Sequence, residues 1–284
     1  MHMTSKKIQA VVSLLLIFLV LNAYAQQSIP FPVSKASDPG LMNSRAVFDA
    51  ESYIFYQPAH FYAFRFGFLY GLQNEKHLLG ISIPFVHNIF EEDLQGYENT
   101  TGLGDIQMMY MTAFTTGKSI GLSRVSPYIE VTSPTGEYQL GRGAGTWLYK
   151  PGVILKFQAT PEVAFYPEVR FQFSGDDANS QGGSDGLPDP DDPDKDGKLQ
   201  NLSFLLPVVV ELESIQAWFS LNARYTQSLT EDEYFIFMRT DFGKMIGNKT
   251  SAALSISKFI AGQPRLNVIV QAKFQFFIGQ IGSY

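Results

Sequence analysis

Three aspartates in one acidic stretch have the spacing of oxygen ligands for calcium. Asp192, Asp194 and Asp196 alternate and are followed directly by a glycine. Calcium loops begin in the same way, with alternate oxygens on the ion and a glycine for the sharp turn. The acid that such loops carry at their twelfth position is missing, because Ser203 stands there. Residues 175–200 are therefore expected to form an acidic outer loop that either binds Ca²⁺ weakly or is only solvated.

The histidines offer little chemistry. His2, His60, His77 and His87 are scattered, and the chain has no cysteine, so neither a zinc-type ligand set nor a disulfide is expected. A hydrolase would need a serine beside a histidine base and an orienting polar group. His87 and Asn88 form the only such fragment, and the sequence places no serine beside them. We therefore predict that the protein is not an enzyme, and no cofactor other than calcium is expected.

The remaining candidates are charged residues that alternate with apolar ones. Side chains alternate across a β-strand, so charges that share one parity lie on one face. Placing such a charge against lipid costs about 2–4 kcal/mol near the membrane midplane, so this face is predicted to line a lumen. The predicted lumen residues are Arg65, Asp105, Arg124, Glu130, Lys150, Lys156, Glu162, Glu168, Arg170, Glu211, Arg224, Arg239, Asp241 and Lys273.

The sequence leaves the role of these charges open. Acids and bases are nearly balanced, so they either pair across a filled interior or line a narrow polar pathway. Phe235, Phe237, Ile269 and Phe277 share the inward parity. They either suit an amphipathic solute better than a simple ion or serve only as packing. Lys258 breaks the pattern and is expected to reach the outer membrane rim.

Long alternating strands must position these side chains. The segments 146–158 and 161–174 both alternate with a period of two. About 13 residues at roughly 3.3 Å each, tilted by about 40°, span close to the 30 Å of a bilayer's hydrocarbon core. Strands in ordinary globular proteins are nearer to five or six residues long. Length and alternation together favour transmembrane strands.

Twelve such strands are expected, after an irregular lead-in over residues 26–44. The even number is typical of single-chain bacterial outer-membrane barrels. The longest connectors, at 91–103, 134–145 and 175–200, all leave the same end. We therefore predict an all-β, transmembrane antiparallel up-and-down β-barrel with long outer loops. The expected strands are 46–57, 60–73, 77–90, 104–116, 120–133, 146–158, 161–174, 201–213, 214–228, 234–243, 250–260 and 266–278.

The N-terminus has the features of an export signal. Lys6 and Lys7 precede an apolar run over residues 11–21, and the small residues Ala23 and Ala25 flank a tyrosine. This pattern predicts a signal peptide over residues 1–25 with cleavage after Ala25. Residues 26–284 would then form one outer-membrane barrel domain. The formal charge of −6, concentrated in the acidic loop, gives no indication of nucleic-acid binding.

Several motifs resemble one family. Residues 100–107 read TTGLGDIQ, residues 126–136 read SPYIEVTSPTG, and residues 141–147 read GRGAGTW, with KPG at 150–152. Together they resemble the family of the MetA pathway of phenol degradation over about residues 102–157. The resemblance implies an outer-membrane barrel that imports small hydrophobic or aromatic compounds, and it implies no catalytic or ligand residue.

Two functions follow as hypotheses. The first is an outer-membrane channel or transporter for small, hydrophobic or aromatic solutes. The alternative is a structural or adhesive barrel that acts through its acidic, calcium-binding outer loop. The expected partners are outer-membrane lipid, the barrel-assembly machinery and a small-molecule solute.

Overall fold

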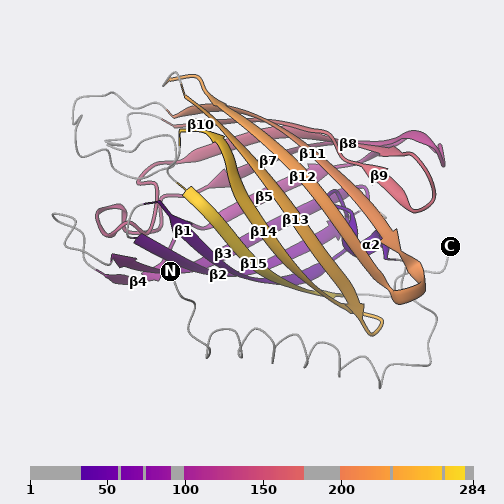
Figure 1. Cartoon of the computed structure of the whole chain (residues 1–284), viewed down its shortest axis with the longest axis horizontal. Helices are drawn as coiled ribbons and strands as arrows, with labels where there is room; N and C mark the ends of the chain where they lie inside the picture. Colours follow the sequence, from indigo (N-terminus) through magenta and orange to yellow (C-terminus); the bar gives the residue numbers. More distant parts are fainter. Residues whose placement is uncertain are drawn as a thin grey trace.

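The strands form one antiparallel sheet that closes on itself as a barrel (Figure 1). The computed structural model describes residues 33–56, 59–72, 75–90, 99–175, 199–230, 233–263 and 266–278. Closure occurs between β1 (Arg45–Phe55) and β15 (Leu266–Phe277), which pair in register from Arg45 opposite Phe277. A closed sheet leaves no unpaired edge, as a membrane requires of its β-proteins.

The barrel has twelve spans, and the predicted fold class is confirmed. Two spans are interrupted, so that β4, β5 and β6 together form the fourth, and β9 and β10 form the seventh. The strands between β1 and β15 are β2 (Ala59–Leu72), β3 (His77–Phe90), β4 (Thr100–Leu103), β5 (Gln107–Thr112), β6 (Phe114–Thr115), β7 (Gly121–Thr132), β8 (Leu148–Gln158), β9 (Val163–Phe165), β10 (Glu168–Ser174), β11 (Gln200–Leu212), β12 (Ala217–Ser228), β13 (Tyr234–Ile246) and β14 (Thr250–Gly262).

Several predicted strand boundaries were wrong, and three of them change where a residue is placed. The fourth span begins at Thr100 in β4, within the predicted connector, because β4 pairs with the end of β3. Residues 213–215 form a short 3₁₀ turn, η3, where a strand was expected. Residues 244–246 continue β13, which places Lys244 on a strand. Alternation identifies a strand's faces, but it does not say where pairing with a neighbour stops.

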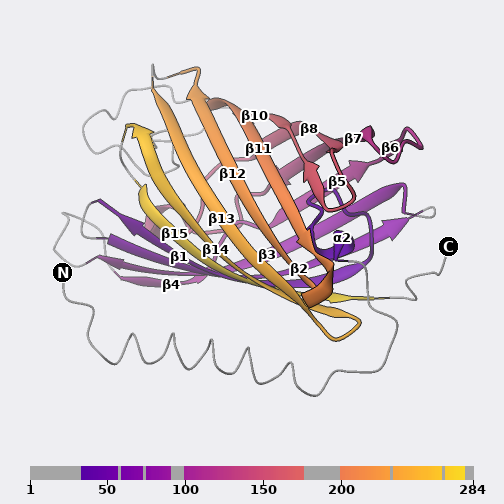
Figure 2. The same cartoon turned by 45° about the vertical axis from the view of Figure 1, so that its right-hand side comes forward.

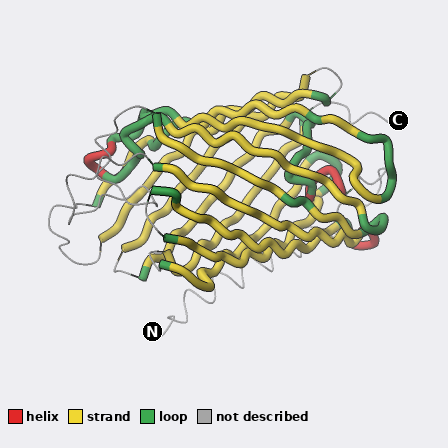
Figure 3. Tube along the Cα trace, turned by 90° about the horizontal axis from the view of Figure 1, so that it is seen from above, coloured by secondary structure: helices red, strands yellow, loops and turns green. Residues whose placement is uncertain are grey.

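The outside of the barrel is apolar. On β2, Phe64, Phe66 and Phe68 are exposed, whereas Arg65 between them is not. The other spans alternate in the same sense, and the strands cross the barrel at a tilt (Figure 3). Within the described strands, Lys244 and Lys258 are the charges that share the outward parity. This belt of apolar side chains meets lipid, so the chain is a transmembrane barrel.

The N-terminal segment lies inside the barrel. The helix α2 (Ser34–Ser37) sits within the ring of strands, at the end that carries the short turns (Figure 2). Long outer loops and short periplasmic turns make this the periplasmic end. The sequence indicated only an irregular lead-in here. We call residues 33–44 the plug.

An apolar cluster holds the plug against the wall. The plug contributes Val33, Leu41 and Met42, each no more than 8% exposed. Burying such side chains stabilises the inserted segment by about 1.5–3 kcal/mol each. The wall residues of this cluster are Leu78, Met111, Ile154, Ala164, Tyr166, Val209, Trp218, Met245 and Phe277. Phe277 is fully buried here, so it packs against the plug and does not face a passing solute.

None of the described helices is long and apolar enough to cross a membrane.

Candidate solute pathway

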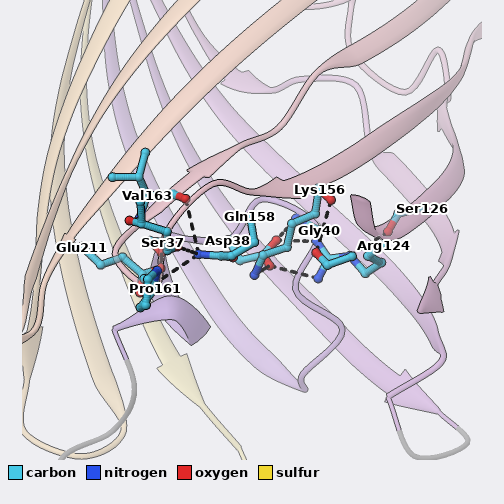
Figure 4. Close-up of polar contacts among 12 residues, drawn as sticks. Ser37, Asp38, Gly40, Arg124, Ser126, Lys156, Gln158, Pro161, Val163 and Glu211 are labelled. Carbon is cyan, nitrogen blue, oxygen red and sulfur yellow. Dashed lines mark hydrogen bonds and ion pairs between the residues drawn. The ribbon is translucent and has the colours of Figure 1, made fainter. Parts of the chain in front are cut away.

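A buried carboxylate fixes the plug to the barrel wall. Asp38 receives Arg124 Nη2 on Oδ1 at 2.5 Å and Arg124 Nη1 on Oδ2 at 2.9 Å. Lys156 Nζ donates to Asp38 Oδ2 at 3.1 Å. The bidentate arginine contact is a strong, directional form of ion pair. Figure 4 shows Arg124 and Lys156 reaching Asp38 from the neighbouring strands β7 and β8.

Hydrogen bonds extend this attachment to other strands. Ser37 Oγ donates to Glu211 Oε1 on β11 at 2.9 Å. Gln275 Nε2 on β15 donates to the carbonyl oxygen of Ala36 at 3.4 Å. Arg45 Nη1 donates to the carbonyl oxygens of Leu41 and Asn43, both at 3.0 Å. The plug is therefore bonded to β1, β7, β8, β11 and β15.

The charge of Asp38 depends on its two cations. Burial alone would raise the pKa of this carboxyl, but Arg124 and then Lys156 outweigh burial, so the pKa lies below the ordinary value of 3.8. Asp38 is thus ionised at neutral pH, and the buried charge is compensated by direct partners.

A polar cavity of about 300 Å³ lies against the plug. Its floor includes Ser37, Asp38 and Pro39, and Arg239 and Asp241 are among its walls. The lining also includes hydroxyl and amide groups of Ser220, Asn222, Ser255 and Gln275. Such a surface suits a hydrated polar group better than an apolar one.

The lumen wall formed by β7, β8 and β10 carries acids and bases in pairs. Lys150 Nζ donates to Glu130 Oε1 at 2.6 Å. Arg170 Nε lies 3.8 Å from Glu168 Oε1, and the Tyr128 hydroxyl donates to the same carboxylate. These predicted lumen residues come together in neighbouring strands, with Lys150 and Glu130 directly opposite in the register of β7 and β8.

The opposite wall repeats this pairing. Arg239 Nε donates to Asp241 Oδ1 at 2.6 Å, and Arg239 Nη2 donates to Ser255 Oγ at 2.9 Å. Ser220 Oγ donates to Asp241 Oδ2 at 2.5 Å. The remaining pairs join Lys273 to Asp49 and Arg65 to Glu51.

Two predicted lumen residues lie elsewhere. Glu162 is exposed in the turn before β9, where Thr160 Oγ1 donates to its carboxylate at 3.0 Å. The prediction placed it on a strand because its parity matched that of Glu168. Asp105 lies between β4 and β5 and binds an outer loop instead of a lumen base.

Asp105 holds the loop 133–147 in place. Its Oδ1 accepts the backbone N–H of Gly136 at 2.8 Å, and its Oδ2 accepts that of Ala144 at 2.6 Å. Asn88 Nδ2 donates to the carbonyl oxygen of Gly141 at 2.9 Å. The motif residues 133–136 and 141–147 therefore build an ordered outer loop, whose fold the sequence did not reveal.

Aromatic side chains gather toward the outer end of the lumen wall. Phe237 and Phe259 are opposite in register and meet edge to face at 5.7 Å between centroids. Phe55 and Phe61 meet in the same manner at 4.9 Å. Aromatic side chains thus lie near the outer ends of β1, β2, β13 and β14, while the Glu130–Lys150 pair lies near the outer ends of β7 and β8.

The other predicted site residues lie apart from one another. His87 Nδ1 lies 2.6 Å from Thr101 Oγ1, and its ring stacks on Tyr62, which fits an interfacial side chain. Lys258 is exposed and bonds Asn267 at the outer end of β14. Within the described ranges, no group of three or more histidine, cysteine or acidic residues is placed to hold a metal.

The remaining candidates are Asp192, Asp194, Asp196 and the cleavage residue Ala25. All of them lie outside the described residues.

Comparisons with known proteins agree with this geometry. A family model described as "Putative MetA-pathway of phenol degradation" matches residues 49–190. No curated protein matches the chain.

Several solved barrels share the fold. The COG4313 outer membrane channel from Pseudomonas putida F1 has 12% identity and a TM-score of 0.62, covering 90% of this chain and 98% of that one. The NanC porin has 11% identity and a TM-score of 0.54, covering 81% and 100%. The KdgM porin has 8% identity and a TM-score of 0.51, covering 82% and 99%. The closed barrel and its apolar belt are those of an outer-membrane protein.

Proposed function

The chain belongs to the family of the MetA pathway of phenol degradation, and from that premise we propose that it is an outer-membrane channel for small aromatic or hydrophobic solutes. The observation that carries the channel itself is the polar cavity of about 300 Å³ inside a closed barrel, whose lining includes the ion pair of Arg239 with Asp241. The similar solved barrels include an outer membrane channel and a porin, which supports a channel function.

The aromatic outer section supports the solute class. A small aromatic molecule entering from outside would meet Phe237 and Phe259 before it reached the cavity beside the plug. Ring-to-ring contacts of this kind stabilise a bound aromatic by about 0.5–1.5 kcal/mol beyond area burial. The plug then limits passage at the periplasmic end.

Conductance of the full mature protein in planar bilayers tests the channel. We expect discrete current steps from the wild type, and block by benzyl alcohol but not by glycerol. Disruption of the Asp38 contacts should raise the current. Silent bilayers for both the wild type and an Asp38→Asn variant that folds correctly would contradict the channel.

The plug also gives the alternative function one supporting observation. A lumen narrowed by residues 33–44 suits a structural or adhesive barrel that acts through its outer loops. The acidic loop 175–200 would then be the active part, and its aspartates would bind Ca²⁺ in the range of about 0.1–1 mM. Calorimetric titration of the wild type against an Asp192→Asn, Asp194→Asn, Asp196→Asn variant tests this, and equal, negligible heats would reject calcium binding.

A further inference from the structure

Arg224 differs from the other basic residues of the lumen wall. The ion pairs described above give a carboxylate partner to Arg65, Lys150, Arg170, Arg239 and Lys273. Arg124 and Lys156 share Asp38. Arg45, at the plug, is bonded to backbone carbonyls.

Among the residues that the structure describes, no carboxylate lies within ion-pair distance of Arg224, and no hydrogen bond to its guanidinium is seen. Its described contact is with the ring of Phe237, 4.9 Å from Cζ to the centroid.

Its position is inside the barrel. Arg224 shares a parity on β12 with Ser220 and Asn222, which line the cavity, and it is the next inward residue toward the outer end. The side chain is half-buried. Desolvating a cation without a compensating anion is costly, so a site of this kind favours the arrival of an anion from solution.

The neighbours of Arg224 strengthen this preference. Its charged neighbours are Arg170 and Arg239, together with Glu168. Glu168 already faces Arg170, and Asp241 already pairs with Arg239. The guanidinium groups of Arg170, Arg224 and Arg239 outnumber the two carboxylates by one. The uncompensated positive charge is that of Arg224.

Apolar side chains adjoin the same guanidinium. Phe237 lies directly opposite Arg224 in the pairing of β12 with β13, and Phe259 lies opposite Phe237 on β14. Ile269 continues this face on β15, between Ser257 and Tyr53. Phe237 is held edge to face by Phe259, so it fixes the plane over which the guanidinium lies. A planar fork held in this way is suited to two parallel hydrogen bonds to a carboxylate.

We propose that Arg224 and the adjoining aromatic face form a binding site in the lumen for organic monoanions with a flat apolar body, such as aromatic carboxylates. This inference rests on the proposed channel function and specifies its solute class. The carboxylate would accept hydrogen bonds from Arg224, and the apolar body would lie along the face of Phe259 and Ile269. A neutral aromatic would gain only the second contact.

The test uses benzoate as the probe and benzyl alcohol as its neutral counterpart. Saturation-transfer NMR on the full mature protein in detergent measures binding without any need for conduction. We expect benzoate to bind the wild type about tenfold more tightly than benzyl alcohol, since only its carboxylate gains charge-assisted hydrogen bonds from Arg224. Arg224→Gln should reduce benzoate affinity to that of benzyl alcohol, which should itself change little.

Lys150→Gln is the matched control, because it removes the same positive charge from the lumen at a base that already pairs with Glu130. It should leave benzoate affinity within about twofold of the wild type. Arg224→Lys keeps the charge without the planar fork and should retain intermediate affinity. It serves as the test variant if Arg224→Gln does not fold, as judged by heat-modifiable gel mobility. Benzoate binding that is unchanged in these Arg224 variants would overturn the site.

Benzoate block of single-channel current then separates the two proposals. Binding that depends on Arg224 in a protein that does not conduct would retain the site and reject the channel. Conduction with binding that ignores Arg224 would retain the channel and reject the site.

Discussion

The plug at the periplasmic end of the barrel and the loop 133–147 at its outer end are held by different chemistry. At the periplasmic end, Asp38 is held by two full positive charges, on Arg124 and Lys156. At the outer end, Asp105 holds a loop through neutral backbone N–H groups of Gly136 and Ala144. Removing the charge of Asp38 leaves two cations unpaired inside the barrel, whereas removing that of Asp105 leaves only weaker hydrogen bonds. The same substitution should therefore have different consequences at the two ends.

The largest effect is expected for a charge placed on the lipid face of the barrel wall, which supports the segments at both ends. Ile256 is 54% exposed on the outside of β14, and its neighbour Ser255 lines the cavity. Ile256→Lys should oppose membrane insertion by about 2–4 kcal/mol near the midplane. Ser255→Lys places the same group beside Asp241 in the lumen and should insert normally. The fraction of protein that becomes heat-modifiable in lipid vesicles measures insertion.

Equal insertion of the Ile256 and Ser255 variants would mean that lumen and lipid faces are reversed. Neither end would then be placed correctly.

The next effect is release of the plug. Asp38→Asn leaves Arg124 and Lys156 facing each other without a buried anion, and losing one member of a buried pair costs on the order of 3 kcal/mol. We expect the plug to leave the lumen and the conductance to rise several-fold. Ser37→Ala is the matched control, since it removes only the hydrogen bond to Glu211, and its conductance should change little. A current that is identical in Asp38→Asn and the wild type would show that the ion pairs do not hold the plug.

Acid should imitate that substitution at the periplasmic end. The pKa of Asp38 in the inserted plug lies below 3.8, because Arg124 and Lys156 outweigh the effect of burial. The released plug would have the ordinary value, so the stabilisation from this group is complete above 3.8 and is lost as pH falls through the lower, inserted value. Conductance should rise in strong acid and stay constant between pH 5 and 8, the range that current recordings should cover along with more acidic points. A step between pH 5 and 8 would point to another group.

The sequence predicted those regions of the fold whose contacts are local in the chain, and it missed regions that depend on distant contacts. Period-two alternation identified the faces of Arg65, Lys150 and Arg239, because each strand reports its own two sides. The plug has no such period, and Asp38 reaches Arg124 across 86 positions of the chain. Only the folded barrel brings these two residues together.

Alternation also gave wrong predictions for residues that lie just beyond the end of a strand. Glu162 shares the parity of the lumen residues but lies in a turn. The sequence predicts Asp105 as a lumen charge because it falls within the expected strand 104–116, while its partners Gly136 and Ala144 come from a later loop that has no regular pattern. Sequence reasoning could have noted the glycines near Gly136 as backbone donors, but their direction depends on the tertiary fold.

The smallest effect on the current is expected for a substitution of Asp105 at the outer end of the barrel. Comparing it with Asp38→Asn decides whether the two ends behave differently. Asp105→Asn keeps an acceptor for one of the backbone N–H groups of Gly136 and Ala144, and it turns an amide N–H toward the other. The loss of one charge-assisted hydrogen bond should weaken attachment of the loop 133–147 by about 1–2 kcal/mol. The loop would then open more often without leaving its place, because Asn88 still donates to the carbonyl oxygen of Gly141. Limited proteolysis should cut the loop faster, and the mean current should change less than in Asp38→Asn.

Glu137→Gln is the control, since Glu137 is a 66% exposed acid of the same loop and pairs with Arg142. If Asp105→Asn raised the current as much as Asp38→Asn, both ends would gate passage in the same way.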